Sequence, residues 1–102
     1  MGKEAKVTGS FVAFRLVNPH SSLKIEVKNQ DGSKTDWAIT GGSVTSLAKF
    51  GIGKIGPNAL HFGDAITVKC IPAKDGHPVG FLKSITYPDG HVIVVSGGGP
   101  ND

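Results

Sequence analysis

The sequence lacks the features that would cross-link a chain or anchor it in a membrane. Only one of its 102 residues, Cys70, is a cysteine, which excludes an intrachain disulfide. No stretch approaches the roughly 20 apolar residues that a membrane-spanning helix needs. The first residues, MGKEAK, lack the apolar segment of a signal peptide. These absences predict a soluble chain with no membrane span.

Long helix-forming runs are also scarce. The 15 glycines and the three Asp-Gly pairs favour short strands joined by tight turns. With 38% hydrophobic residues the chain can bury one core, whereas each half of it would be too small to do so. We therefore predict a single, mostly β domain over residues 1–96, followed by a disordered glycine-rich tail over residues 97–102.

Apolar and polar residues alternate along several segments, which predicts strands. A long, bent first strand covers residues 6–17, with Gly9 supplying a bulge or kink. A short helix follows the third strand, with Ser43 as its N-cap and Gly51 as its left-handed exit. Residues 52–62 read as a loop that has room for one turn of helix. The remaining strands are expected near residues 23–28, 35–40, 65–71, 80–87 and 91–96.

The order of these elements indicates the fold. Three strands, a helix, two strands and a short sixth strand are typical of an OB-like barrel, in which the helix plugs one end. We predict an OB-like, five- to six-stranded antiparallel barrel with one short helix between strands three and four. An open meander sheet packed on one helix is the alternative.

Two loops of such a barrel flank its usual binding face. The first would carry Asn18-Pro19-His20, and the second Asp75 and His77. Pro19 has a fixed φ, so it would partly preset the orientation of the His20 imidazole. We predict a ligand-binding face that includes Asn18, His20, Trp37 and His77. The plainer interpretation is that Asn18-Pro19 only makes the turn and that His20 donates to a carbonyl.

Trp37 lies at the centre of the third predicted strand. Together with Phe11, Phe14 and Phe81 it could stack a flat ligand, although aromatic residues on strands more often belong to a core. Basic residues outnumber acidic ones by only 11 to 8, and the lysines are scattered. This pattern disfavours nucleic acid as a partner.

Catalysis would depend on His20, because an imidazole titrates near neutral pH. Asp75 or Asp36 would be its orienting carboxylate. Ser21 and Ser22 follow His20, but adjacency in sequence does not make a triad. The glycine clusters lack a nucleotide-binding pattern, and we predict no cofactor.

Four histidines raise the question of a metal site. They are His20, His61, His77 and His91. Neither an HExxH motif nor a paired-cysteine motif accompanies them, so we predict no metal site. If a metal did bind, His20 and His77 would be the ligands.

Several quoted stretches together resemble a known family. They are VTGSFVAFRLVNPHSSLKIEVKNQDG, TDWAITGGSVTSLAKFG, LHFGDAITVKCIPAKDG and SITYPDG. The chain resembles an uncharacterised family of small exported bacterial proteins marked by an Asn-Pro-His motif. That resemblance implies a leader peptide, a periplasmic location and a short His-rich segment after the leader. The sequence starts at MGKEAKVTGS and shows neither the leader nor the His-rich segment.

The leading interpretation is a small β-barrel binding protein. It would recognise a small ligand or a protein partner at the face flanked by the His20 and His77 loops. The alternatives are a cofactor-free isomerase, lyase or hydrolase that uses His20, and a periplasmic metal-binding protein. The apolar last strand, VIVV, is also expected to offer an edge for a homodimer.

Overall fold

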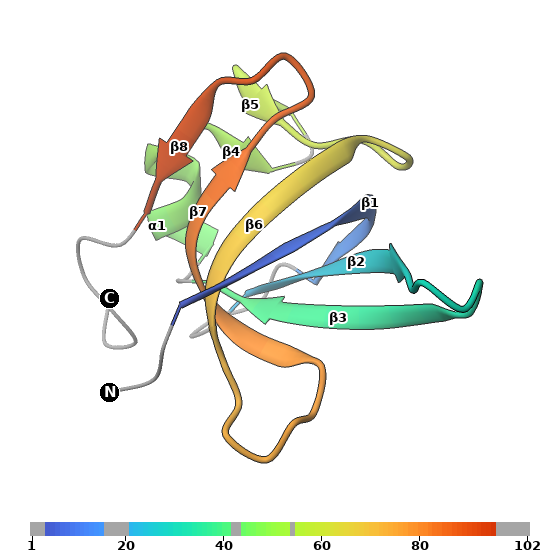
Figure 1. Cartoon of the computed structure of the whole chain (residues 1–102). Coiled ribbons are helices and arrows are strands. Elements are labelled where there is room, and N and C mark those ends of the chain that lie inside the picture. The colour runs from blue at the N-terminus through green and yellow to red at the C-terminus, as the bar shows by residue number, and fades with distance from the viewer. Residues whose placement is uncertain (1–3, 16–20, 42–43, 54, 96–102) are drawn as a thin grey trace.

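A computed structural model of the chain describes residues 4–15, 21–41, 44–53 and 55–95 (Figure 1). Strands dominate these ranges, and one short helix follows the third strand. The elements are β1 Ala5–Arg15, β2 Ser22–Lys28, β3 Lys34–Thr40, α1 Val44–Lys49, β4 Ile52–Gly53, β5 Asn58–Ala59, β6 Ala65–Pro72, β7 Val79–Thr86 and β8 Val92–Val94.

Five of the strands close into a barrel. The sheet order is β3-β2-β1-β6-β7-β8, and β3 also pairs with β7. This confirms the predicted OB-like barrel. The closing β3–β7 pair is parallel, with Ala38 opposite Val79, while the other strand pairs of this sheet are antiparallel. A closed ring with an odd number of strands must contain at least one parallel pair, so the barrel is mixed and not purely antiparallel. Strand β8 pairs with the second half of β7, beyond the residues that pair with β3.

The bent first strand serves two neighbours, as the sequence predicted. Its first half pairs with β6, and its second half pairs with β2. The register break lies between Phe11 and Ala13, so the extra residue is Val12 and not Gly9. Gly9 instead permits a close approach of β2, because a Cβ at this position would lie 2.3 Å from the Glu26 carbonyl oxygen.

The barrel interior is filled by the inward residues of every long strand. Cys70 is fully buried there, and burial raises the pKa of its thiol, which fits an inert core cysteine. Trp37 is half-buried and packs against the same core. The buried residues are Val7, Phe11, Leu23, Ile25, Ile39, Leu47, Ile52, Leu60, Ile66, Val68, Cys70, Leu82, Ile85 and Tyr87.

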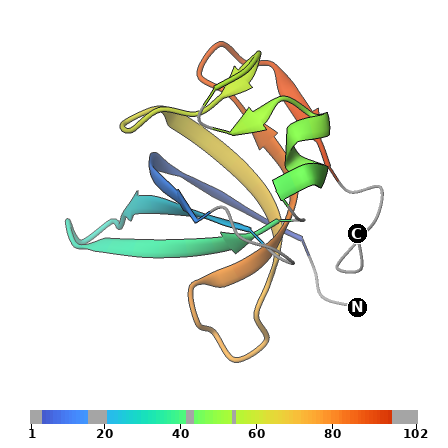
Figure 2. The same ribbon diagram turned by 180° about the vertical axis from the view of Figure 1, so that it is seen from behind.

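The segment after β3 covers one end of the barrel. Helix α1 exits through Gly51 at φ 74°, as predicted, while the predicted N-cap Ser43 lies outside the described residues. The prediction of a loop over residues 52–62 was incomplete, because β4 and β5 form a small parallel pair there. Two-residue strands are too short to leave a periodic pattern. Figures 1 and 2 show α1, β4 and β5 at the same end of the barrel as β8, away from the β6–β7 loop.

Helix α1 is six residues long. Across the described ranges, no helix has the length and apolar character needed to cross a membrane. The predicted tail over residues 97–102 lies outside these ranges.

Candidate binding face

The structure describes only one of the two loops of the predicted site. Asn18 and His20 lie outside the described residues, so their roles stay predictions. Asp75 and His77 form an exposed turn between β6 and β7. The backbone N–H of His77 donates to Asp75 Oδ1 at 3.0 Å, and His77 Nδ1 lies 2.8 Å from Asp75 Oδ2. These hydrogen bonds lower the pKa of the Asp75 carboxyl. The carboxylate therefore stabilises the turn in which it lies.

The second predicted orienting carboxylate is also engaged. Asp36 Oδ2 lies 3.8 Å from Lys24 Nζ on the neighbouring strand. Both side chains are more than half exposed, so this ion pair contributes little to stability. Each carboxylate that was expected to orient His20 thus has another partner.

The four aromatic residues of the predicted platform lie on different faces of the barrel wall. Trp37 shares the inward face of β3 with Ile39, opposite to the exposed Ala38. Phe11 and Phe14 contact each other with ring centroids 4.8 Å apart and belong to the core side of β1. Phe81 faces outward and is 44% exposed. Trp37 therefore packs against the core, while its predicted ligand contact stays a prediction.

The barrel surface instead carries a groove over β1, β2 and β3. Ala13 lies opposite Lys24, and Lys24 lies opposite Ala38, so two small side chains flank one long one in a single cross-strand row. The alanines leave a hollow of about 200 Å³. It is lined by Ala13, Phe14, Arg15, Ser22, Leu23, Lys24 and Ala38.

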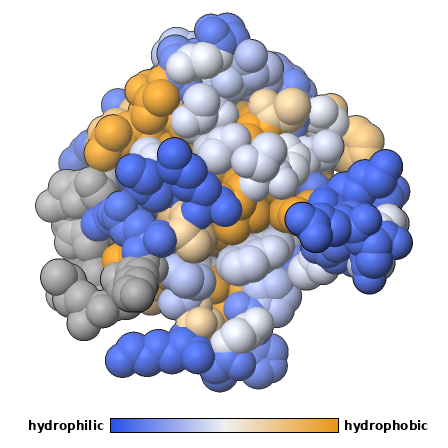
Figure 3. All heavy atoms as spheres, viewed as in Figure 1, coloured by the Kyte–Doolittle hydropathy of each residue, from blue (hydrophilic) through white to orange (hydrophobic). Residues whose placement is uncertain are grey.

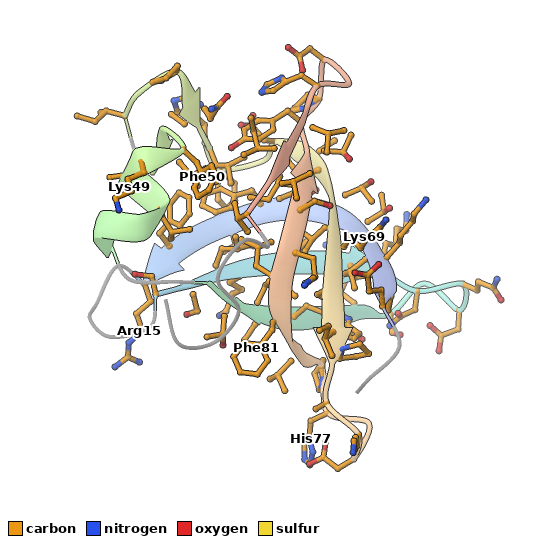
Figure 4. All side chains as sticks on the ribbon, turned by 90° about the vertical axis from the view of Figure 1, so that its left-hand side faces the viewer. Arg15, Lys49, Phe50, Lys69, His77 and Phe81 are labelled. Carbon is orange, nitrogen blue, oxygen red and sulfur yellow. The ribbon has the colours of Figure 1, made fainter. Side chains whose placement is uncertain are left out.

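An apolar strip continues from this groove across the barrel closure. Val79 lies opposite Ala38, and Phe81 lies opposite Thr40. Val79 is 39% exposed, so both β7 side chains leave apolar surface to solvent. In Figure 4, Phe81 lies between Arg15 and His77, and the Arg15 side chain points away from the barrel. We call the following set the groove face: Ala13, Arg15, Lys24, Ala38, Val79 and Phe81.

The charge of the groove face is concentrated on its basic side chains. Arg15 is exposed at the end of β1, and no ion pair with another described residue involves it. Lys24, in contrast, forms an ion pair with Asp36. An incoming acidic group would therefore meet Arg15 first.

The sequence contained only a weak signal of this groove. Ala13 and Ala38 look like ordinary small strand residues, and they are 25 positions apart. They flank Lys24 only because β1 and β3 both pair with β2 in the right register. A cross-strand alignment of the alternating segments could have found the row, but local periodicity could not.

The described residues contain no group of three or more His, Cys, Asp or Glu side chains that could hold a metal ion. His77, one of the two candidate ligands, is paired with Asp75.

The groove face lies within the part of the chain that matches a known family. A comparison with curated proteins found no match. A family of unknown function, DUF6152, matches residues 1–83, which is most of the chain and includes every groove-face residue. The match supports the resemblance to an uncharacterised family, while the bacterial origin, the export and the Asn-Pro-His motif stay predictions. The chain belongs to the family of unknown function DUF6152.

Proposed function

We propose that this protein is a small binding module that holds an acidic group with a short apolar stem on its groove face. The observation that carries the proposal is the apolar groove of about 200 Å³ beside Arg15, which forms no ion pair with another described residue. The stem would lie in the groove lined by Ala13, Lys24 and Ala38, and the acidic group would reach the Arg15 guanidinium. The shape of the groove and the positive charge of Arg15 would then together determine which ligand binds.

The size of the groove limits what it can hold. Sites for drug-sized molecules typically enclose about 300–1,000 Å³. A groove of about 200 Å³ suits a group the size of a leucine side chain or a short alkyl chain. The Val79 and Phe81 surface would contact the remainder of a longer ligand. This fits either a free small carboxylic acid or an acidic, partly apolar segment of a partner protein.

The groove lining favours binding over catalysis. Among the residues that the structure describes, this lining includes Arg15, Lys24 and Ser22 but no His, Cys, Asp or Glu. A general acid or base near neutral pH would have to come from outside these described lining residues. The enzymatic alternative that uses His20 stays a prediction. The periplasmic location, on which the groove has no bearing, also stays a prediction.

The proposal can be tested by titrating the 15N-labelled protein with hexanoate and following the backbone amide shifts. We expect shifts at residues 13–15, 22–24 and 38, with a dissociation constant on the order of millimolar. The uncharged analogue hexanamide should bind about 1.4- to fivefold more weakly, since an exposed charge pair contributes roughly 0.2–1 kcal/mol. Arg15→Gln should remove this difference.

Two tryptophan substitutions separate groove binding from general surface binding. Ala38→Trp fills the groove and should weaken hexanoate binding on the order of tenfold or more. Ala65→Trp places the same side chain on another exposed strand position and should leave binding unchanged. Acetyl-Leu-Glu-amide binding more tightly than hexanoate would indicate a protein partner. Shifts that Ala38→Trp does not reduce would overturn the proposal.

A further inference from the structure

The chain contains two Asp-Gly-His turns with the same local geometry. In both turns the histidine N–H donates to Oδ1 of the aspartate at 3.0 Å, and its ring Nδ1 contacts the same carboxylate. The His91 turn, between β7 and β8, has one additional contact. His91 Nε2 lies 3.0 Å from Oδ1 of Asn58 on β5, 33 residues away. His91 therefore joins two elements, whereas no such contact links the His77 ring to another described element.

The orientation of the Asn58 amide is set by a second contact. Its Nδ2 donates to the Phe50 carbonyl oxygen at 2.5 Å, directly after α1. A carbonyl oxygen can only accept, so the amide nitrogen must face Phe50. The oxygen of the amide, an acceptor, is then the atom that faces His91.

The His91 ring thus lies between two oxygen acceptors, the Asp89 carboxylate at Nδ1 and the Asn58 amide oxygen at Nε2. A neutral imidazole has one N–H and can donate to only one of them, whereas an imidazolium donates to both. We propose that His91 is a proton-dependent clasp that ties the α1–β5 segment to the β7–β8 turn when the ring is charged. At higher pH the neutral ring would set a lone pair against the Asn58 oxygen, and the contact would open.

Two titratable side chains, Asp89 and Tyr87, contact the His91 ring. Hydrogen bonds from the His91 backbone and ring lower the pKa of Asp89, which keeps this carboxylate ionised above about pH 4. Tyr87 stacks on the ring at a centroid distance of 4.3 Å. Burial, with a smaller effect of the Asp64 charge, raises the pKa of Tyr87 to about 12, so the phenol stays neutral. His61 Nδ1 lies 3.7 Å from Oδ2 of the same Asp64.

The clasp would control one end of the barrel. Tyr87 also donates its hydroxyl to the Asn58 backbone carbonyl at 2.6 Å, so Asn58 is held from two sides. Figure 1 shows β5 beside the β7–β8 turn, at the end of the barrel that α1 and β4 cover. Loss of the proton would release one of these two ties and loosen residues 50–60 without unfolding the barrel. This device is separate from the groove face.

Hydrogen exchange of the full chain tests the clasp. Protection factors of the amides in residues 50–60 would be measured at pH 5.5 and pH 8, which bracket the usual titration of imidazole. We expect the protection factors to be on the order of tenfold higher at pH 5.5, because one charge-assisted hydrogen bond contributes a free energy of that order. In His91→Gln this pH dependence should disappear. The second Asp-Gly-His turn provides the matched control, because His77→Gln should keep the wild-type response.

A direct measurement on the wild-type ring does not depend on any variant. Nitrogen shifts of the His91 ring should show both Nδ1 and Nε2 protonated at pH 5.5. A ring that carries a single proton at this pH would overturn the proposal. Equal protection at the two pH values, or a pH dependence that survives in His91→Gln, would overturn it as well.

Discussion

Gly9 shows how the absence of one side chain lets β1 serve two neighbours. A Cβ at this position would lie 2.3 Å from the Glu26 carbonyl oxygen and 2.7 Å from Ile25 Cγ2. Real Cβ atoms essentially never approach other atoms so closely, and the nearest atom here belongs to the backbone. The β2 strand can pass β1 at this point only because the side chain is a hydrogen atom.

We therefore predict that Gly9→Ala destabilises the protein by at least about 1–3 kcal/mol, the usual cost of overpacking. Urea unfolding followed by Trp37 fluorescence would measure the loss. Gly53→Ala is the control, because its Cβ would meet only the Ile55 carbonyl oxygen at 3.8 Å. It should change the free energy of unfolding by no more than about 0.5 kcal/mol. Equal stability of the two variants would contradict this account of Gly9.

At the scale of elements, Tyr87 joins the end of β7 to β5. The side chain is 6% exposed, and its hydroxyl donates to the Asn58 carbonyl at 2.6 Å. Burial and, to a smaller extent, the Asp64 charge raise its pKa from 10.0 to about 12. The folded state thus keeps the phenol protonated at a pH where the unfolded chain would lose the proton.

This shift makes the protein sensitive to alkali. The contribution of Tyr87 is fully present below pH 10 and is lost as the pH rises from 10 towards 12. Two units of pKa correspond to about 2–3 kcal/mol of stability at most. Tyr87 is the only tyrosine in the chain, so absorbance at 295 nm reports its ionisation alone.

We expect Tyr87→Phe to be less stable than the wild type at pH 8, by about 1 kcal/mol for the lost hydrogen bond. The variant should also lose less stability than the wild type between pH 10 and pH 12. Urea midpoints at these pH values would measure both effects, and the lysines that titrate in this range are common to both proteins. Parallel alkaline curves would show that the Tyr87 phenol is not protected by folding.

At the scale of the whole molecule, exposed aspartates recur in the turns between strands. Asp31 accepts from the Ser33 side chain and backbone N–H, and these bonds lower its pKa from 3.8. Asp75 and Asp89 accept in the same manner from the histidines two positions later, and their pKa values are also lowered. Three separate turns therefore favour the ionised carboxylate in the folded state.

The sign of the resulting pH dependence follows from these lowered pKa values. The contribution of each aspartate is present above pH 4 and is lost as the pH falls through the folded-state pKa. We expect the urea midpoint to fall between pH 5 and pH 3. Replacing Asp31, Asp75 and Asp89 together by Asn should make this fall smaller while keeping the turns. An identical fall in the triple variant would place the acid sensitivity in other carboxylates.

The sequence by itself determined the long strands, the helix and their order, but not the two-residue strands β4 and β5. Alternation located the long strands, Asp-Gly pairs located turns, and Gly51 marked the end of α1, because these signals depend on neighbouring residues. The order of the elements was then sufficient to predict an OB-like barrel. The burial of Cys70 also followed from its place in an apolar strand.

Tertiary structure alone decided which residues meet across the barrel. Strand register placed Lys24 between Ala13 and Ala38, and the closure of an odd ring made the β3–β7 pair parallel. Trp37 was predicted as a ligand contact, but the side of β3 on which it lies became clear only once the barrel closed. His91 meets Asn58 because the covered end of the barrel folds back on itself. Local periodicity carries no information about such contacts, since they depend on register and closure between segments far apart in the chain.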